Sequence, residues 1–150
     1  MKKSLLLSSV LFSLVLGACG TGGVKYLKKG ETNNSGNLSQ TIQDFKYLGD
    51  SDDKKQVIYV LTYTLRSSFD KTMSLSGLTY YSAVFDEVPG NGGISWLYPD
   101  AKFPKSIAPN TDETIKMALF GFSDWEKVVI SYNDSQTGIS YSFGLARADY

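Results

Sequence analysis

Histidine is absent from this sequence, and its single cysteine, Cys19, directly follows an apolar run. Without histidine the chain offers neither a Ser-His-Asp arrangement nor a histidine metal ligand. The remaining acids that could do chemistry come as neighbours, Asp86 with Glu87 and Asp112 with Glu113. Adjacent residues on a strand point to opposite faces, so neither pair is placed to act as an acid–base couple. We therefore expect no enzyme activity and no cofactor.

Three further carboxylates, Asp50, Asp52 and Asp53, lie close together in one short polar stretch. Alternate carboxylates in a tight loop can converge on a hard cation such as Ca²⁺. The calcium-loop pattern breaks at once, because Lys54 and Lys55 follow without a glycine or a closing glutamate. The sequence favours a hydrophilic hairpin tip and leaves a weak metal site as the alternative.

The segment from residue 86 to residue 110 is the most unusual part of the chain, because it holds all four prolines and several glycines. It also carries Trp96, Tyr98 and Phe103. A connection this long inside a small domain tends to be functional, and aromatic side chains bring large contact area with little rotamer entropy to lose. These three residues are our candidate binding site for a protein or a sugar. The alternative is that Trp96 and Phe103 fill the space beside a short edge strand.

The elements that would position such residues begin after an N-terminal segment that has the pattern of a secretory signal. Met1-Lys2-Lys3 is basic, and residues 4–16 are apolar apart from four serines. This matches the charged n-region and the apolar h-region of a signal peptide. The run is shorter than the ~20 residues of a membrane-spanning helix. We expect residues 1–18 to be a signal peptide.

The end of this signal carries a more specific pattern. Leu16-Gly17-Ala18-Cys19 resembles the lipobox of bacterial lipoproteins. The resemblance implies cleavage between Ala18 and Cys19 and acylation of the Cys19 thiol, with fatty acids such as palmitate. Several acyl chains, at ~0.8 kcal/mol per buried methylene, give lasting attachment. We expect a lipid-anchored protein on the outer face of a Gram-positive cytoplasmic membrane. Ordinary secretory cleavage, which would leave a free thiol, is the alternative.

The cleaved signal has a second interpretation. Residues 11–18, LFSLVLGA, resemble the hydrophobic octapeptide pheromones that enterococci release from lipoprotein signal peptides. Any leucine-rich signal can give this likeness by chance, so pheromone release is kept as an alternative role for the tail.

Residues 19–39 are rich in Gly, Asn, Ser and Thr and lack sustained periodicity, which is typical of a flexible tether. Twenty such residues would span about 25 Å as a coil. Lys25, Lys28 and Lys29 could contact anionic lipid from here, although solvated lysines are the plainer interpretation. The chain has 15 basic and 15 acidic residues and no basic block, so we expect no nucleic-acid partner.

After the tether, apolar and polar residues alternate with a period of two, which predicts half-buried strands. No window shows a convincing apolar face of helical period. About seven short strands in some 110 residues predict an all-β sandwich of two antiparallel sheets over residues 40–150. The expected strands cover residues 41–48, 57–65, 74–85, 94–98, 114–119, 127–132 and 139–145.

Residues 40–143 also resemble the immunoglobulin-like domains of small Gram-positive lipoproteins of unknown function, which are similar to the immunoprotective extracellular antigens of mycobacteria. The resemblance rests on VIYVLTYTL after the Asp-rich hairpin, then SIAPNTDETIKMALFGF, then KVVISYNDS. Asn110 stands where glycine is usual, and asparagine tolerates the same left-handed conformation. Arg66-Ser67-Ser68 replaces the usual asparagine-containing corner. The resemblance implies a fold and names no reaction.

These observations predict a membrane-anchored binding module rather than an enzyme. Its partners would be membrane lipid, through acylated Cys19, and a protein or cell-wall glycan, through the segment around Trp96. A protective lipoprotein that blocks phage entry or neutralises a toxin at the cell's own membrane is the alternative function.

Overall fold

The computed structural model describes residues 23–75, 80–95 and 97–150, so Ala18 and Cys19 lie outside the described residues. Nearly all regular structure is β, and a short 3₁₀ helix, η2 (Arg147–Asp149), follows the last strand. No helix in the described residues is long and apolar enough to cross a membrane. The strands are β1 (Thr32–Ser35), β2 (Leu38–Asp50), β3 (Val57–Ser67), β4 (Met73–Ser74), β5 (Tyr81–Phe85), β6 (Gly93–Ser95), β7 (Ser106–Ile107), β8 (Asp112–Gly121), β9 (Lys127–Asp134) and β10 (Ile139–Ala146).

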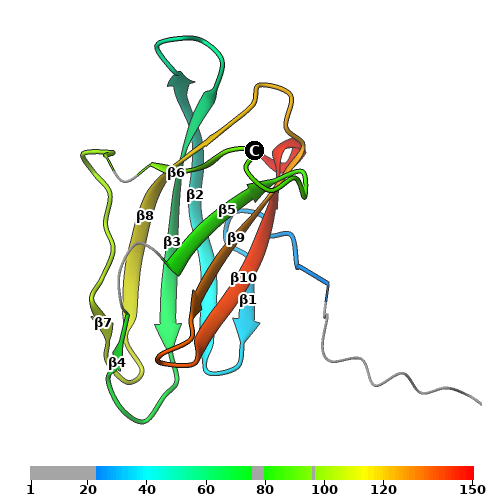
Figure 1. Cartoon of the computed structure of the whole chain (residues 1–150). Coiled ribbons are helices and arrows are strands. Elements are labelled where there is room, and N and C mark those ends of the chain that lie inside the picture. The colour runs from blue at the N-terminus through cyan, green and yellow to red at the C-terminus, as the bar shows by residue number, and fades with distance from the viewer. Residues whose placement is uncertain (1–22, 76–79, 96) are drawn as a thin grey trace, which may run out of the picture.

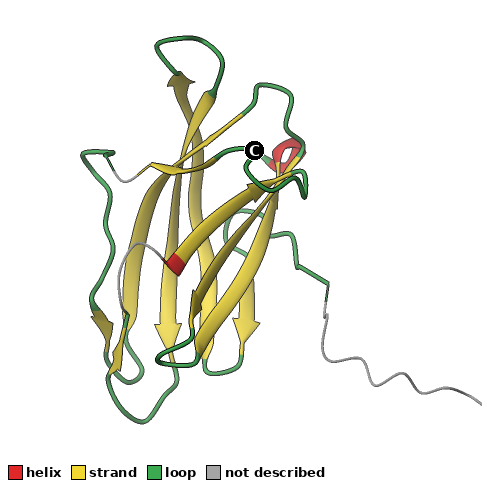
Figure 2. Cartoon of the chain, in the orientation of Figure 1, coloured by secondary structure: helices red, strands yellow, loops and turns green. Residues whose placement is uncertain are grey.

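Two antiparallel sheets face each other across the core (Figures 1 and 2). The larger has the strand order β1-β2-β3-β8-β6 and the smaller has the order β10-β9-β5, while β4 and β7 form a separate small ladder. Apart from β1, the two sheets have the A-B-E-D and C-F-G orders of a constant-type immunoglobulin domain. The predicted all-β, immunoglobulin-like sandwich of about seven strands is confirmed, with β1 as an added edge strand.

The core is built from the alternate residues that point inward from both sheets. In β3 every second residue from Val57 to Leu65 is buried, and in β10 every second residue from Ile139 to Leu145 is buried. This is the pattern that alternation in the sequence predicts, since successive side chains on a strand point to opposite faces. Each fully buried aliphatic or aromatic side chain stabilises the fold by about 1.5–3 kcal/mol.

A cluster of aromatic rings closes one end of this core. Trp125, between β8 and β9, is buried and packs edge-on against Phe45, Tyr59 and Phe85, with ring centroids 5.9, 5.3 and 5.4 Å away. Tyr150 packs edge-on against Phe45 at 5.1 Å. Edge-to-face pairs of this kind add to the gain from burial, so the cluster holds both sheets and the C-terminal end together.

The predicted flexible tether over residues 19–39 is wrong for its later part, because the folded domain begins well before residue 40. β1 pairs with β2 through a tight turn in which Gly36 has a φ of +59°. The stretch NNSGN has the composition of a linker, but Asn and Gly are equally the residues of a two-residue hairpin turn. β1 itself has no apolar alternation, so the sequence carried no strand signal there.

The residues before β1 are also fixed to the sandwich. Leu27 is fully buried, and its N–H donates to the Gly144 carbonyl at 2.9 Å. In return the Gly144 N–H donates to the Lys25 carbonyl at 2.8 Å, so this segment runs parallel to β10 along its edge. The Tyr150 hydroxyl donates to the Leu27 carbonyl at 2.9 Å. The two ends of the described chain are therefore held together on one side of the sandwich.

The proline-rich segment between β5 and β8 follows the outer edge of β8. β6 pairs with β8, and Lys102 then forms a second bridge with Lys116 lower on the same strand. Gly92, just before β6, has a φ of +114°, and a Cβ there would lie 2.3 Å from the Phe120 carbonyl oxygen. Only glycine fits such a position, so Gly92 allows this segment to approach β8 closely.

Candidate functional site

A shallow, mostly apolar groove of about 310 Å³ lies on the outer face of the five-stranded sheet, near the β2–β3 hairpin. Its floor comes from outward-facing residues of β3 and β8, and its rim comes from the chain that follows β6. We call it the outer groove. Its principal apolar and aromatic lining residues are Leu48, Ile58, Leu97, Tyr98, Pro99 and Phe120.

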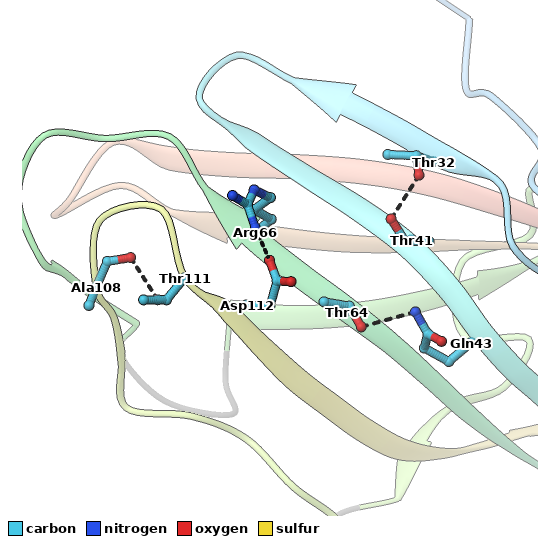
Figure 3. A network of polar contacts seen from close by, with 8 residues as sticks. All are labelled: Thr32, Thr41, Gln43, Thr64, Arg66, Ala108, Thr111 and Asp112. Carbon is cyan, nitrogen blue, oxygen red and sulfur yellow. Dashed lines mark hydrogen bonds and ion pairs between the residues drawn. The ribbon is translucent and has the colours of Figure 1, made fainter.

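Only one half of this outer face is apolar. The outward-facing residues of β3 change along the strand from aliphatic residues, including Ile58, to threonines. In the polar half the Gln43 side-chain amide donates to the Thr64 hydroxyl at 3.1 Å, and Arg66 pairs with Asp112 at 2.9 Å (Figure 3). An apolar concavity that adjoins a polar surface on the same sheet is typical of an interaction site.

The rim of the outer groove is held by polar contacts below it. Lys102 and Lys116 exchange two backbone hydrogen bonds, of 2.8 and 2.9 Å. The Lys116 ammonium lies 5.8 Å from the Tyr98 ring centroid and 3.8 Å from the Asp100 carboxylate. The Tyr98 hydroxyl donates to the same carboxylate at 3.4 Å. Leu97 extends from this support with 93% of its surface exposed. Exposure of nearly the whole side chain is unusual for a large apolar residue.

Of the three aromatic residues predicted as one binding site, the structure describes Tyr98 and Phe103, and these two have different surroundings. Tyr98 lines the outer groove, and Trp96 lies outside the described residues. Phe103 instead packs against the core, with its ring centroid 5.4 Å from that of Tyr81. Phe103 therefore follows the alternative prediction, in which it fills space beside an edge strand.

The aspartates of the β2–β3 hairpin mostly serve the hairpin itself. Asp50 accepts a hydrogen bond of 2.7 Å from the Tyr47 hydroxyl, and Asp53 accepts one of 2.6 Å from the Ser51 hydroxyl. The Ser51 hydrogen bond holds the pKa of Asp53 below its ordinary value. Asp52 is exposed. Among the described residues no three acidic, cysteine or histidine side chains are grouped to hold a metal.

The neighbouring acid pairs noted in the sequence have structural partners. Asp86 has a φ of +49°, and its carboxylate accepts the N–H groups of Glu126 and Lys127 at 3.0 and 2.8 Å. Asp112 pairs with Arg66 across the polar half of the outer face. These contacts fix a loop and a strand end.

One polar contact inside the core has no signature in the sequence. The hydroxyls of Tyr63 and Tyr141 lie 2.9 Å apart between the two sheets, and Tyr141 donates to the Tyr81 hydroxyl at 3.5 Å. Burial raises the pKa of Tyr63 and Tyr141 well above its usual range and also raises the pKa of Tyr81. These phenols therefore stay neutral and serve as hydrogen-bonding core residues.

The outer groove itself was only partly foreseen, since Leu48, Ile58 and Phe120 were not among the candidate residues. One signal could have located it. Ile58 and Val60 break the apolar–polar alternation of β3, which means that the strand is apolar on both faces at that end. A strand of this kind needs a cover on its outer side.

Comparisons with known proteins support the fold. The sequence matches no protein-family model and no curated protein sequence. A candidate lipoprotein, ycdA, from Bacillus subtilis superimposes with a TM-score of 0.60 at 11% identity, over 82% of this chain and 40% of the ycdA chain. This chain thus spans about 40% of the length of that protein.

Two further solved structures match over nearly their whole length. The secreted protein MPT63 from Mycobacterium tuberculosis has a TM-score of 0.54 at 12% identity, over 84% of this chain and 99% of its own. The yjhA protein from Bacillus subtilis has a TM-score of 0.50 at 13% identity, over 79% of this chain and 98% of its own. The predicted similarity to a secreted mycobacterial protein is confirmed for the fold, and identities this low carry no activity across.

Proposed function

We propose that this protein is a membrane-anchored extracytoplasmic lipoprotein that works by binding a partner through the outer groove. The outer groove is the observation that carries the proposal, because its rim holds an almost fully exposed leucine above a pair of backbone hydrogen bonds to β8. The signal-like N-terminus and the cysteine that ends it supply the location. The fold-level similarity to a candidate lipoprotein and to a secreted protein is consistent with that location.

The chemistry of the outer groove favours a protein segment over a glycan as the partner. Sugar recognition needs several polar groups that converge on hydroxyls, whereas Leu48, Ile58 and Phe120 offer aliphatic and aromatic surface. Apolar anchors that insert into a groove of this size are the usual centres of protein–protein interfaces. The Lys116–Asp100 pair beside the rim would fix the orientation of the bound segment.

A photo-crosslinking amino acid introduced at Leu97 tests the proposal in intact cells. We expect a discrete crosslinked adduct from this position, and none of that size from Gln43, which lies on the polar half of the same face. With this protein and its partner both purified, Leu97→Asp should weaken binding at least about tenfold, because an unpaired carboxylate is costly to bury. A tenfold loss of affinity corresponds to only ~1.4 kcal/mol.

Gln43→Asp is the matched control for the loss of affinity, since it adds the same charge to the same face outside the outer groove. Equal crosslinking from both positions, or an unchanged affinity for the Leu97→Asp protein with its fold intact, would rule out the groove as the binding site.

A further inference from the structure

The chain joins the sandwich at a defined place on the outer face of the three-stranded sheet. Gly144 alternates with the inward-facing Phe143 and Leu145, so its missing side chain would point outward. The Tyr26 ring occupies that space, and a Cβ on Gly144 would lie 2.6 Å from it. The Lys127 ammonium also lies over this ring, 5.2 Å from its centroid. The start of the folded domain is therefore fixed beside this face.

The length of chain before this point limits how far the domain can move from a lipid at Cys19. Six residues lie between Cys19 and Tyr26, so seven peptide steps connect the two. Even fully extended they reach only about 25 Å, and a flexible coil of this length spans about 15 Å. β3 alone has eleven residues, which is about 36 Å of strand. An anchor this short keeps the side of the sandwich that carries Tyr26 near the bilayer.

The outer face of the three-stranded sheet has a composition that suits this position. Its outward-facing residues are mainly serine and valine, with Val84, Val129, Ser131 and Ser142 near the centre. Among the outward positions of β5, β9 and β10, all of them described, Lys127 is the one charged side chain. Such a face approaches polar headgroups without desolvating buried charge.

The charges near the chain's junction with the fold are of both signs, because Lys127 shares a shallow hollow with Asp86, Glu87, Asp124 and Glu126. Lys127 lies over Tyr26 at the edge of the uncharged face, whereas the Lys25 ammonium donates to the Thr32 carbonyl at 2.8 Å. A lysine close to an anionic membrane surface contributes about 1 kcal/mol of attraction. Lys28 is also exposed here but forms an ion pair with Asp149 at 3.0 Å, so it adds less.

We propose that the outer face of the three-stranded sheet lies against the lipid headgroups of the membrane, which turns the outer groove on the opposite face away from the bilayer. This inference rests on the lipid anchor of the proposed function and adds an orientation to it. Because the two sheets pack face to face, one outer face cannot meet the bilayer without presenting the other to the cell wall and its proteins.

Short-range quenching on vesicles tests the orientation. The lipidated protein is placed on phosphatidylcholine–phosphatidylglycerol vesicles that contain a lipid with a nitroxide headgroup, and one bimane-labelled cysteine is added. The acylated thiol of Cys19 would not take the label. Ser131→Cys places the probe on the uncharged face, and Thr62→Cys places it on the opposite outer face as the matched control. Both positions are half-buried and lie midway along a central strand.

We expect quenching at position 131 to exceed quenching at position 62 several-fold. Equal quenching at the two positions, or stronger quenching at position 62, would overturn the orientation while leaving the anchor in place. A wild-type protein that does not float with the vesicles at all would instead contradict the anchor itself. Circular dichroism of both labelled variants shows that the sandwich is intact.

Discussion

At the residue scale, the hydrogen-bonded hydroxyls of Tyr63 and Tyr141 make the stability of the protein sensitive to alkali. Burial raises the pKa of both groups in the folded protein, so each is harder to ionise there than in the unfolded chain. Below the unfolded value of about 10 the stabilisation is fully present, and it is lost as the pH rises further toward the folded values.

We therefore expect the free energy of unfolding to hold up to about pH 10 and to fall steeply above it. The double variant Tyr63→Phe with Tyr141→Phe removes both ionisations and should show a shallower fall, with a loss at pH 8 of about 1 kcal/mol from the missing hydrogen bond. Urea unfolding at pH 8, 10 and 11 measures this. Parallel curves for the variant and the wild type would contradict it.

The role of a residue could be predicted where its contacts are with neighbours in the sequence. The engagement of Asp50 and Asp53 within a hairpin tip follows from a short polar stretch between two strands, and that description of the tip holds. The separation of Tyr98 from Phe103 could not be predicted, because it depends on the turn closed by the Ala101–Tyr98 hydrogen bond and on the Lys102–Lys116 bridge that follows. Contacts between residues distant in sequence leave no local pattern.

At the element scale, the segment before β1 acts as a parallel partner for β10, and the fit between Tyr26 and Gly144 decides whether it stays there. Gly144→Ala would place a methyl group 2.6 Å from the Tyr26 ring. We expect a loss of about 1–3 kcal/mol of stability from this overpacking. Gly23→Ala is the matched control, since a Cβ at that position meets nothing within 4 Å.

A second change separates the ring from other causes. Adding Tyr26→Ala to Gly144→Ala removes the clash, so the double variant should be more stable than the sum of the two single changes predicts. Thermal unfolding of the four proteins provides the coupling energy. Simple additivity would mean that the ring does not occupy the space over Gly144.

Strand prediction succeeded where one face of a strand is buried along its whole length. β3, β8, β9 and β10 all alternate and were all expected. β1 has no buried residue, so its pairing was not visible in the sequence. The tether prediction failed for the same reason, because the burial of Leu27 depends on β10 more than a hundred residues later.

At the scale of the whole molecule, the anchor decides where the sandwich works. Replacing Cys19 with alanine removes the thiol that would be acylated, and we expect cells fed labelled palmitate to yield an unlabelled protein that appears in the medium. A single acyl chain gives only marginal attachment to a membrane, whereas several acyl chains give stable attachment. We therefore expect the Cys19→Ala protein to lose nearly all of its membrane retention.

Fractionation of cells that carry either form measures this. A wild-type protein found entirely in the medium, or palmitate that remains on the Cys19→Ala protein, would contradict the anchor. Neither outcome affects the fold, which the described residues establish independently of residue 19.

The architecture of the whole molecule could be predicted more fully than its surface. Alternation and turn residues predict the two sheets, and proteins with only 11–13% identity share the arrangement. The outer groove arises from outward-facing residues on which the fold depends little, so sequence periodicity could not locate it. Its apolar floor was visible only as an interruption of the alternation in β3.

The hydrogen bond from Tyr150 to the Leu27 carbonyl has a practical consequence for work with this protein. An affinity tag or fluorescent reporter appended at the C-terminus would start next to the segment that leads to Cys19, and it would crowd whatever surface the domain rests on. The exposed turn between β2 and β3 extends from the end of the sandwich (Figure 1), and its polar residues make it the better place for an inserted epitope.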